Sequence, residues 1–262
     1  MSRICIIGDV HGMTELLQAL LAQLDLQPGD TLVSLGDLVD KGPDPAGTVR
    51  ALSKLQREAP FEVVLVEANH EDRHLRYQRN LTERPKIARQ MANASARLPE
   101  LDAVLTDDDR EFLQSAVLFW RLPRHGIICL HGGIPANMNA LPDEPTAIHE
   151  MSKKDQNWYR QILRTRFIDA ETGKMLSLGR EKEGDPFWAE VYDGRFGHVI
   201  FGHQPFFDGP AEFPHATGID TGAVDGGALT ALVIQSDGSR TYVSEAADSA
   251  GQAMRGAIAP LR

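Results

Sequence analysis

The stretch IIGDVHG, from Ile6 to Gly12, decides how this chain is interpreted. A run of aliphatic residues stops at Asp9, and His11 follows two positions later. Such a run is typical of a buried strand, and in open α/β sheets ligands gather just beyond the carboxyl ends of the strands. The stretch therefore predicts a core strand that ends in a carboxylate and an imidazole directed at a ligand.

Four later apolar runs end in the same way. They are followed by Asp37 and Asp40, by Asn69, His70 and Glu71, by His131, and by His203. One Asp-x-His pair is weak support, because a lone histidine after a strand is more often a hydrogen-bonded loop residue. Polar endings on five runs in succession are not expected of loops that serve structure alone, and together they predict a metal site.

The side chains at these endings also define the expected metal chemistry. Oxygen and imidazole ligands without a thiolate suit Mn²⁺, Fe or Zn²⁺. The candidate ligands are too many for one tetrahedral ion and enough for two ions about 3.5–4 Å apart that share one carboxylate, for which Asp37 is the candidate. Two carboxylates against two divalent ions leave a charge of about +2, which attracts phosphate. The six candidates are Asp9, His11, Asp37, Asn69, His131 and His203.

The order of expected elements predicts an α/β fold. Strands at 3–9, 30–37 and 61–71 alternate with helices at 13–24 and 44–58, which implies parallel pairing and right-handed crossovers. Residues 73–120 interrupt this order as an inserted helical cap, and a further helix is expected at 156–167. Later strands are expected at 126–133, 197–204, 216–222, 228–235 and 240–246, so we expect two packed sheets flanked by helices.

Composition narrows the function classes. The net charge of −10 argues against general affinity for nucleic acid or for an anionic membrane. No run of eighteen apolar residues is present, so no membrane-spanning helix is expected. Cys5 and Cys129 lie inside apolar runs and are expected to be buried thiols in a reducing cytoplasm. Residues 246–262 are expected to form a loosely held tail beyond a domain at 1–245.

The motifs GDVHG, GDLVDKGPD, NHE, HGG and GHQP, in this order, resemble the phosphoprotein phosphatase (PPP) branch of the calcineurin-like metallophosphoesterases. The resemblance runs from about Ile4 to Ile234 and is greatest to bacterial and phage members, which include lambda phosphatase and diadenosine tetraphosphatases. It implies a four-layer αββα sandwich of two mixed sheets with a helical insert. It also implies hydrolysis of phosphomonoesters by a metal-bound hydroxide, with two divalent ions that we expect to be Mn²⁺.

The resemblance implies roles for matching residues. Asp9, His11 and Asp37 would hold the first metal, and Asp37, Asn69, His131 and His203 the second. His70 would protonate the leaving oxygen, oriented by Asp40. This pair also follows from the chemistry, because a histidine beside a metal site needs a carboxylate to fix its tautomer and raise its pKa. Phosphate contacts are implied for Lys41, Arg180 and Asn69.

Two positions depart from the family pattern. Lys41 stands where the family usually has Arg, and offers a single compact charge instead of a flat fork. Ala68 stands where the family usually has Gly, and is tolerable unless its φ is positive. Arg180 is placed by its distance from the GHQP motif, and its alternative is an ordinary surface arginine.

Two segments could recognise the rest of a substrate. Residues 73–97 contain seven Lys or Arg and one acidic residue, either a basic cap that guides a polyanion or a solvated helix face. Trp188, Tyr192 and Arg195 could stack on a base, but packing is favoured.

On family resemblance, a phosphoserine or phosphothreonine protein phosphatase is our first interpretation of the function, and a dinucleotide polyphosphate hydrolase is the alternative. A nucleic-acid 3′-phosphate is disfavoured by charge, and a non-catalytic regulator that binds a phosphorylated partner is the remote alternative.

Overall fold

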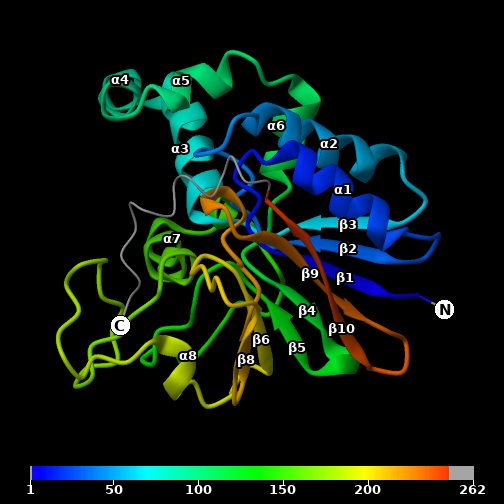
Figure 1. Cartoon of the computed structure of the whole chain (residues 1–262). Coiled ribbons are helices and arrows are strands. Elements are labelled where there is room, and N and C mark those ends of the chain that lie inside the picture. The colour runs from blue at the N-terminus through cyan, green and yellow to red at the C-terminus, as the bar shows by residue number, and fades with distance from the viewer. Residues whose placement is uncertain (1, 248–262) are drawn as a thin grey trace.

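The computed structural model describes residues 2–247 and consists of two mixed, five-stranded sheets packed face to face (Figure 1). In the first sheet β1, β2 and β3 run parallel to one another, and β9 is antiparallel to both of its neighbours, β1 and β10. Its order is β10 (Arg240–Ala246), β9 (Ala228–Ile234), β1 (Ile4–Ile7), β2 (Thr31–Ser34), β3 (Glu62–Leu65). The second sheet pairs β5, β6 and β8 in parallel, in the order β4 (Trp120–Leu122), β5 (Ile127–Cys129), β6 (His198–Phe201), β8 (Ala216–Gly218), β7 (Ala211–Phe213).

Helices cover both outer faces of the sheet pair. Against the first sheet lie α1 (Thr14–Leu24) and α2 (Pro45–Glu58), with Pro45 in the first turn of α2 and Asp44 as its cap. On the second sheet lie α7 (Lys153–Tyr159), η3 (Arg160–Leu163) and α8 (Trp188–Val191). Short 3₁₀ turns complete the chain: η1 (Pro123–His125), η2 (Ile148–Glu150), η4 (Ala223–Asp225).

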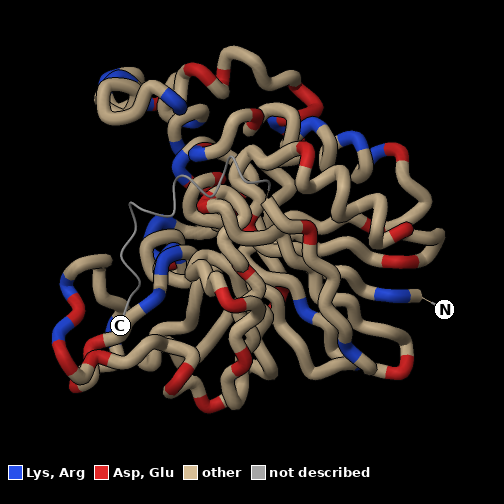
Figure 2. The backbone as a smooth tube through the Cα atoms, viewed as in Figure 1, with Lys and Arg blue, Asp and Glu red and all other residues tan. Residues whose placement is uncertain are grey.

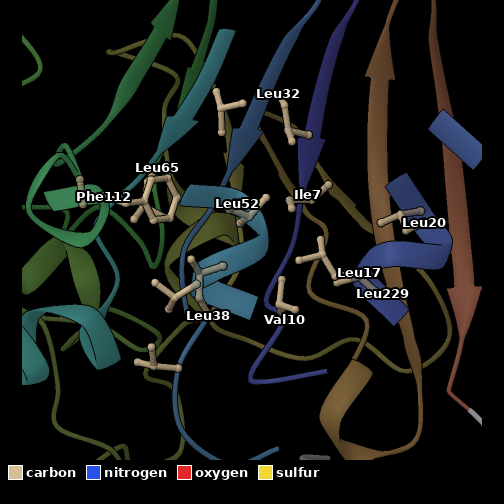
Figure 3. Close-up of a cluster of buried hydrophobic side chains, with 14 of the residues drawn as sticks. Ile7, Val10, Leu17, Leu20, Leu32, Leu38, Leu52, Leu65, Phe112 and Leu229 are labelled. Atoms are coloured by element: carbon tan, nitrogen blue, oxygen red, sulfur yellow. The ribbon is translucent and has the colours of Figure 1, made fainter. Parts of the chain in front are cut away.

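Alternation along the central strands builds three hydrophobic layers. Cys5 and Ile7 of β1 face the helices α1 and α2, while Ile6 faces the second sheet. In β6, Ile200 faces the first sheet and its neighbours face outward. This period of two is what a strand buried on both sides requires. Figure 3 shows the layer between the first sheet and its helices, where Leu17, Leu20 and Leu52 meet the strands. The predicted αββα fold is confirmed.

Four helices lie between β3 and β4, in the region expected to form the cap. They are α3 (Asn69–Glu83), α4 (Pro85–Ala94), α5 (Arg97–Asp102) and α6 (Asp107–Gln114). Tyr77, Ala88 and Leu98 form a small core of their own, and α6 begins with a capping box at Thr106. In Figure 1 these helices rise beyond the edge of the sheets, next to α2.

Two expectations differ from the structure in detail. The helix expected at 156–167 ends earlier, because α7 gives way to η3 and the chain then turns at Arg164 and bends at Arg166. A close backbone approach accounts for this turn: a Cβ at Gly132 would lie 2.5 Å from the Ile162 carbonyl oxygen. Of the expected tail at 246–262, Ala246 is the last residue of β10, and 248–262 lie outside the described residues. Across residues 2–247, the search for a helix that could cross a membrane finds none.

Candidate metal centre

The carboxyl ends of β1, β2, β3, β5 and β6 meet at one edge of the sheet pair, because the parallel strands of each sheet run the same way. The loops that follow these strands carry all the candidate ligands. Asn69 and His70 begin α3 and are partly exposed. The others are 0–7% exposed: Asp9, His11, Asp37, His131 and His203.

Asp37 lies at the middle of this cluster. Its Oδ2 atom is 3.3 Å from Nε2 of His11 and 3.5 Å from Nε2 of His131. Two sets of potential ligand atoms can each hold a metal ion, and Asp37 belongs to both. The first set adds His11 and His70, and the second adds His131 and His203. One carboxylate between two imidazole groups is the arrangement expected of a bridging ligand.

Hydrogen bonds fix the histidine tautomers so that they can bind a cation. Nδ1 of His11 donates to the Val39 carbonyl at 2.9 Å, and Nδ1 of His131 donates to the Leu35 carbonyl at 2.9 Å. Both Nε2 atoms are therefore unprotonated and directed inward, that of His11 at 2.9 Å from Nζ of Lys41 and that of His131 at 3.0 Å from Oδ1 of Asn69. Among the described residues, Nε2 of His203 is buried without a hydrogen-bond partner. Such an atom is costly unless it binds a ligand that the protein alone does not supply.

Burial keeps the imidazoles of His131 and His203 neutral, which is the form that binds metal. It lowers the pKa of His131 to about 4. For His203, burial together with the charges of His131 and Arg166 lowers the pKa well below its usual range.

The pKa values of the two central carboxylates, Asp9 and Asp37, shift in opposite directions. Burial, followed by the charges of Asp220 and Asp37, raises the pKa of Asp9 well above its usual range. The oxygens of Asp9 accept from the His203 backbone N–H at 3.1 and 3.0 Å. Although burial opposes it, the neighbouring His131, His70 and His11 hold the pKa of Asp37 well below its usual range. Buried like charges favour a bound cation, so this donor set fits divalent metal ions.

The backbone of the loops is strained at the same residues. Five of the non-glycine residues with positive φ are His11, Asp37, Asp40, Lys41 and His203, with φ from 46° to 68°. Left-handed backbone is unfavourable for L-residues and persists where neighbouring contacts impose it. Ala68, by contrast, is extended with a φ of −113°, so it replaces glycine without strain.

Glu71 supplies the contacts that hold the Asp37 turn. Its fully buried carboxylate accepts from the backbone N–H groups of Asp37, Leu38 and Val39 at 2.8, 2.7 and 3.3 Å. The side chain of Glu71 therefore fixes the backbone from which Asp37 extends.

Asp40 and His70 form a close pair beside the metal centre. Nδ1 of His70 lies 2.6 Å from Oδ2 of Asp40, and Nε2 of His70 lies 3.9 Å from Oδ2 of Asp37. Burial opposes the charged imidazolium, but the Asp37 and Asp40 carboxylates outweigh it and raise the pKa of His70. His74, one turn further along α3 and 2% exposed, contacts the other Asp40 oxygen at 3.0 Å.

Two cationic side chains lie at the centre. Nζ of Lys41 is 2.9 Å from Nε2 of His11. Arg166 donates to the His203 carbonyl at 2.6 Å, and burial lowers its pKa against the opposing pull of Asp9 and Asp37. Arg180 is not brought to the cluster: its side chain is exposed, and its hydrogen bond within residues 2–247 runs from its backbone N–H to the Ser177 carbonyl.

Sequence reasoning missed Arg166, His74 and Asp220. Arg166 lies near the end of the helix expected at 156–167, so its position gave no sign of a role at the strand ends. His74 would have been found by beginning α3 at Asn69, which puts positions 70 and 74 on one face. Asp220 is 6% exposed and follows β8, whose parallel pairing with β6 directs its carboxyl end at the same edge. An acidic residue after an apolar strand was the available signal.

The aromatic segment near the last ligand packs into the core. Trp188 is 1% and Tyr192 6% exposed, and both belong to the outer hydrophobic layer of the second sheet. Arg195 binds Asp193 and the carbonyl of Ala136. The expected preference for packing over base stacking agrees with this burial.

The basic residues of 73–97 lie along α3, α4 and the start of α5, where Figure 2 shows them gathered at one side of the molecule. They do not all face solvent freely. Arg76, with Arg160 and Arg164 from η3 and its end, surrounds the buried carboxylate of Asp72 at 3.6, 2.9 and 3.1 Å. These ion pairs tie the first turns of α3 to the second sheet.

Comparisons with known proteins agree on one family. A family model described as calcineurin-like phosphoesterase matches residues 2–207. The asymmetrical bis(5'-nucleosyl)-tetraphosphatase PrpE of Bacillus velezensis is 30% identical over 241 residues, covering 86% of each protein. The symmetrical bis(5'-nucleosyl)-tetraphosphatase of Pseudomonas putida is 27% identical over 269 residues, covering 88% of this chain and 89% of that protein.

Solved structures with the same architecture include the crystal structure of a candidate diadenosine tetraphosphatase, with a TM-score of 0.66, 25% identity and 94% coverage of both chains. A serine/threonine protein phosphatase from Saccharomyces cerevisiae is 14% identical, with a TM-score of 0.57 and coverage of 95% of this chain and 80% of that one. At this identity the second likeness concerns the fold alone.

Proposed function

The chain belongs to the calcineurin-like phosphoesterases, and from this premise we propose that it hydrolyses dinucleoside polyphosphates, with diadenosine tetraphosphate as the model substrate. Its relatives that cover most of both chains carry the names of bis(5'-nucleosyl)-tetraphosphatases. They favour the alternative interpretation of the sequence, a dinucleotide polyphosphate hydrolase, over the first, a serine/threonine protein phosphatase. The observation that supports a phosphoesterase site is Asp37, shared by two groups of potential metal-ligand atoms.

The cofactor of the proposal is a pair of divalent cations. Asp9, His11 and Asp37 would hold one, and Asp37, Asn69, His131 and His203 the other. We propose Mn²⁺, because oxygen and imidazole donors without a thiolate suit it. When bound, the cations would activate a water molecule for attack on phosphorus and offset the charge of the phosphate.

The side chains of this chain perform the remaining tasks. His70 donates a proton from Nε2 to the leaving oxygen, and Asp40 holds Nδ1 and stabilises the protonated ring. Arg166 and Lys41 bear positive charge at the same centre and contact the phosphate oxygens. Arg166 thus takes the part first given to Arg180.

The proposal also assigns a cytoplasmic location. Cys5 and Cys129 are free, buried thiols, and a reducing compartment suits them.

A side-by-side assay tests the proposed substrate. Protein stripped with a chelator and reloaded with MnCl₂ is given diadenosine tetraphosphate or a phosphoserine peptide at equal concentration. Nucleotide products are separated by anion exchange, and phosphate is measured from the peptide. We expect a higher kcat/KM for the dinucleotide. A higher kcat/KM for the peptide would restore the first interpretation, and activity that persists in excess chelator would refute the metal site.

A further inference from the structure

A cavity of about 430 Å³ lies between the start of α2 and helix α5 of the cap. Its walls come from the loop that follows β2, including Asp40, Gly42 and Pro43, and from Arg97, Leu101 and Val104. This volume falls in the range of about 300–1,000 Å³ typical of small-molecule pockets. None of the roles assigned above uses the cavity, although Asp40 forms part of its wall.

The position of the cavity relates it to the leaving group. Asp40 contacts Nδ1 of His70, and the opposite nitrogen of the same ring is directed at Asp37 in the metal centre. The metal centre and the cavity therefore lie on opposite sides of the His70–Asp40 pair. The leaving oxygen takes its proton from Nε2, on the metal side of this pair, so the rest of the leaving group must extend past the pair to reach the cavity.

One wall of the cavity is held rigidly to the ligand loop. The backbone N–H of Gly42 donates to the His11 carbonyl at 3.0 Å, and that of Asp44 donates to the Gly12 carbonyl at 3.0 Å. A Cβ at Gly42 would collide with the His11 carbonyl oxygen, so this approach requires glycine. The wall thus keeps a fixed place relative to the metal ligands.

The other wall is one face of the cap. Leu98 and Leu101 are buried and anchor α5. Arg97, Glu100 and Val104 lie three to four residues apart and line the cavity. Among the described residues, the side chains of Arg97 and Glu100 have no hydrogen-bond or ion-pair partner, so they are free to bind a ligand.

The charge of the lining selects the kind of group that fits. The lining carries three carboxylates, those of Asp40, Asp44 and Glu100, and a single guanidinium, that of Arg97, so a phosphate would be repelled. Proline, leucine and valine side chains suit the flat apolar faces of a base, and the carboxylate of Glu100 can accept hydrogen bonds from ribose hydroxyls or an exocyclic amine. A neutral nucleoside matches this lining.

Phosphates have a separate place between the cavity and the metal centre. Nη1 of Arg73 lies 3.9 Å from Oδ2 of Asp40, and Lys41 follows Asp40 in the chain. These two cations flank the carboxylate that divides the cavity from the metals. We propose that the cavity binds the nucleoside of the leaving nucleotide, while Arg73 and Lys41 contact the phosphates that join it to the phosphorus under attack. This inference rests on the proposed function.

The test compares a substrate that reaches the cavity with one that does not. Val104→Trp fills the cavity from a position that is 55% exposed, so the fold should tolerate it. Arg97→Ala removes the guanidinium, and Arg89→Ala, on an exposed face of α4, is the matched control. kcat/KM is measured for diadenosine tetraphosphate and for p-nitrophenyl phosphate, and AMP is tested as a competitive inhibitor.

We expect Val104→Trp to lower kcat/KM for diadenosine tetraphosphate about tenfold relative to that for p-nitrophenyl phosphate. It should also weaken inhibition by AMP but leave inhibition by orthophosphate unchanged. Arg97→Ala should act in the same direction and Arg89→Ala should not. Equal losses for both substrates, or none, would overturn the inference while the proposed function stands. A wild-type protein that leaves the dinucleotide intact would contradict the proposed function instead, and the cavity would then be judged by AMP inhibition of nitrophenyl phosphate hydrolysis.

Discussion

Replacing Asp40 by Asn tests the proton-donating pair most directly. The change keeps the size of the side chain but removes the charge that lies 2.6 Å from Nδ1 of His70. Asn also accepts the left-handed backbone at this position, where φ is 66°. The fold should therefore survive, and the effect should fall on the protonated state of His70.

The structure sets the size of the effect. A hydrogen bond to a charged group contributes about 1.5–3 kcal/mol, and about 1.4 kcal/mol is tenfold in rate, so kcat should fall about 10- to 100-fold. Two carboxylates raise the pKa of His70 against the effect of burial. Losing one of them lowers that pKa, so the protonated acid is lost at lower pH. The alkaline limb of the kcat/KM profile should move to lower pH.

The assay uses Mn²⁺-loaded protein and phosphomonoesters with leaving groups of different basicity. A basic alkoxide needs the proton of His70 more than nitrophenolate does, so Asp40→Asn should slow an alkyl phosphate more than nitrophenyl phosphate. Asp25→Asn is the matched control, because Asp25 is exposed and also has a positive φ, of 43°. An equal loss for all leaving groups, with an unmoved alkaline limb, would refute the assigned role.

Four further predictions concern the metal centre and its surroundings. Asp37→Asn should lower Mn²⁺-dependent turnover at least about 100-fold, measured with nitrophenyl phosphate, because both ligand sets share this carboxylate. His203→Ala should reduce the rise in Tm that MnCl₂ gives to chelator-treated protein, since it removes a buried nitrogen without a partner; an unchanged rise would exclude it as a ligand. Arg166→Met should raise KM for phosphate substrates about tenfold, and orthophosphate inhibition should weaken in parallel. Burial raises the pKa of Glu67 to about 8 from 4.5, so its contribution to stability is present below pH 4.5 and lost as the pH rises towards 8. Glu67→Gln should therefore raise the free energy of unfolding at pH 8.5 by about 5 kcal/mol and not at pH 4.5, whereas the exposed Glu62→Gln should follow the wild type in urea melts.

The strand-end ligands could be predicted because their signal is local. Each apolar run that stops at a carboxylate, imidazole or carboxamide marks both a buried strand and a polar loop, as at Asp9 and His203. Parallel strands bring such loops to one edge of a sheet, so convergence follows from the order of elements. The four-layer architecture came from the same source together with family resemblance.

The residues that were missed depend on tertiary contacts. Arg166 reaches the centre only because the helix stops at Tyr159 and the chain turns under the close approach of Gly132. Asp220 can be assigned to the site only when β8 is known to pair in parallel with β6, whereas the sequence around β8 resembles a hairpin strand. Arg180 was placed by distance along the chain, which does not fix a side chain on an exposed loop.

The substrate cannot be predicted from the motifs, for a related reason. The strand-end ligands and the pair His70–Asp40 serve any phosphoester, so they do not separate a phosphoprotein from a dinucleotide. Discrimination needs contacts that only one substrate makes, and in this chain those available lie in the cap, where α5 faces the cavity beside Asp40.

The strained loops fix the metal ligands, whereas part of the cap lines the cavity beside them. Left-handed backbone at Asp37 and Asp40 points both carboxylates inward from a turn that ordinary extended chain would not form. The three backbone bonds to Glu71 hold that turn, and Glu71 itself belongs to α3, the first helix of the cap. A change in the cap that displaces α3 therefore alters the metal ligands, whereas a change at Arg97 or Glu100, the exposed residues of α5 that line the cavity, alters only the cavity. Substrate preference can then vary through α5 while the chemistry is conserved by α3.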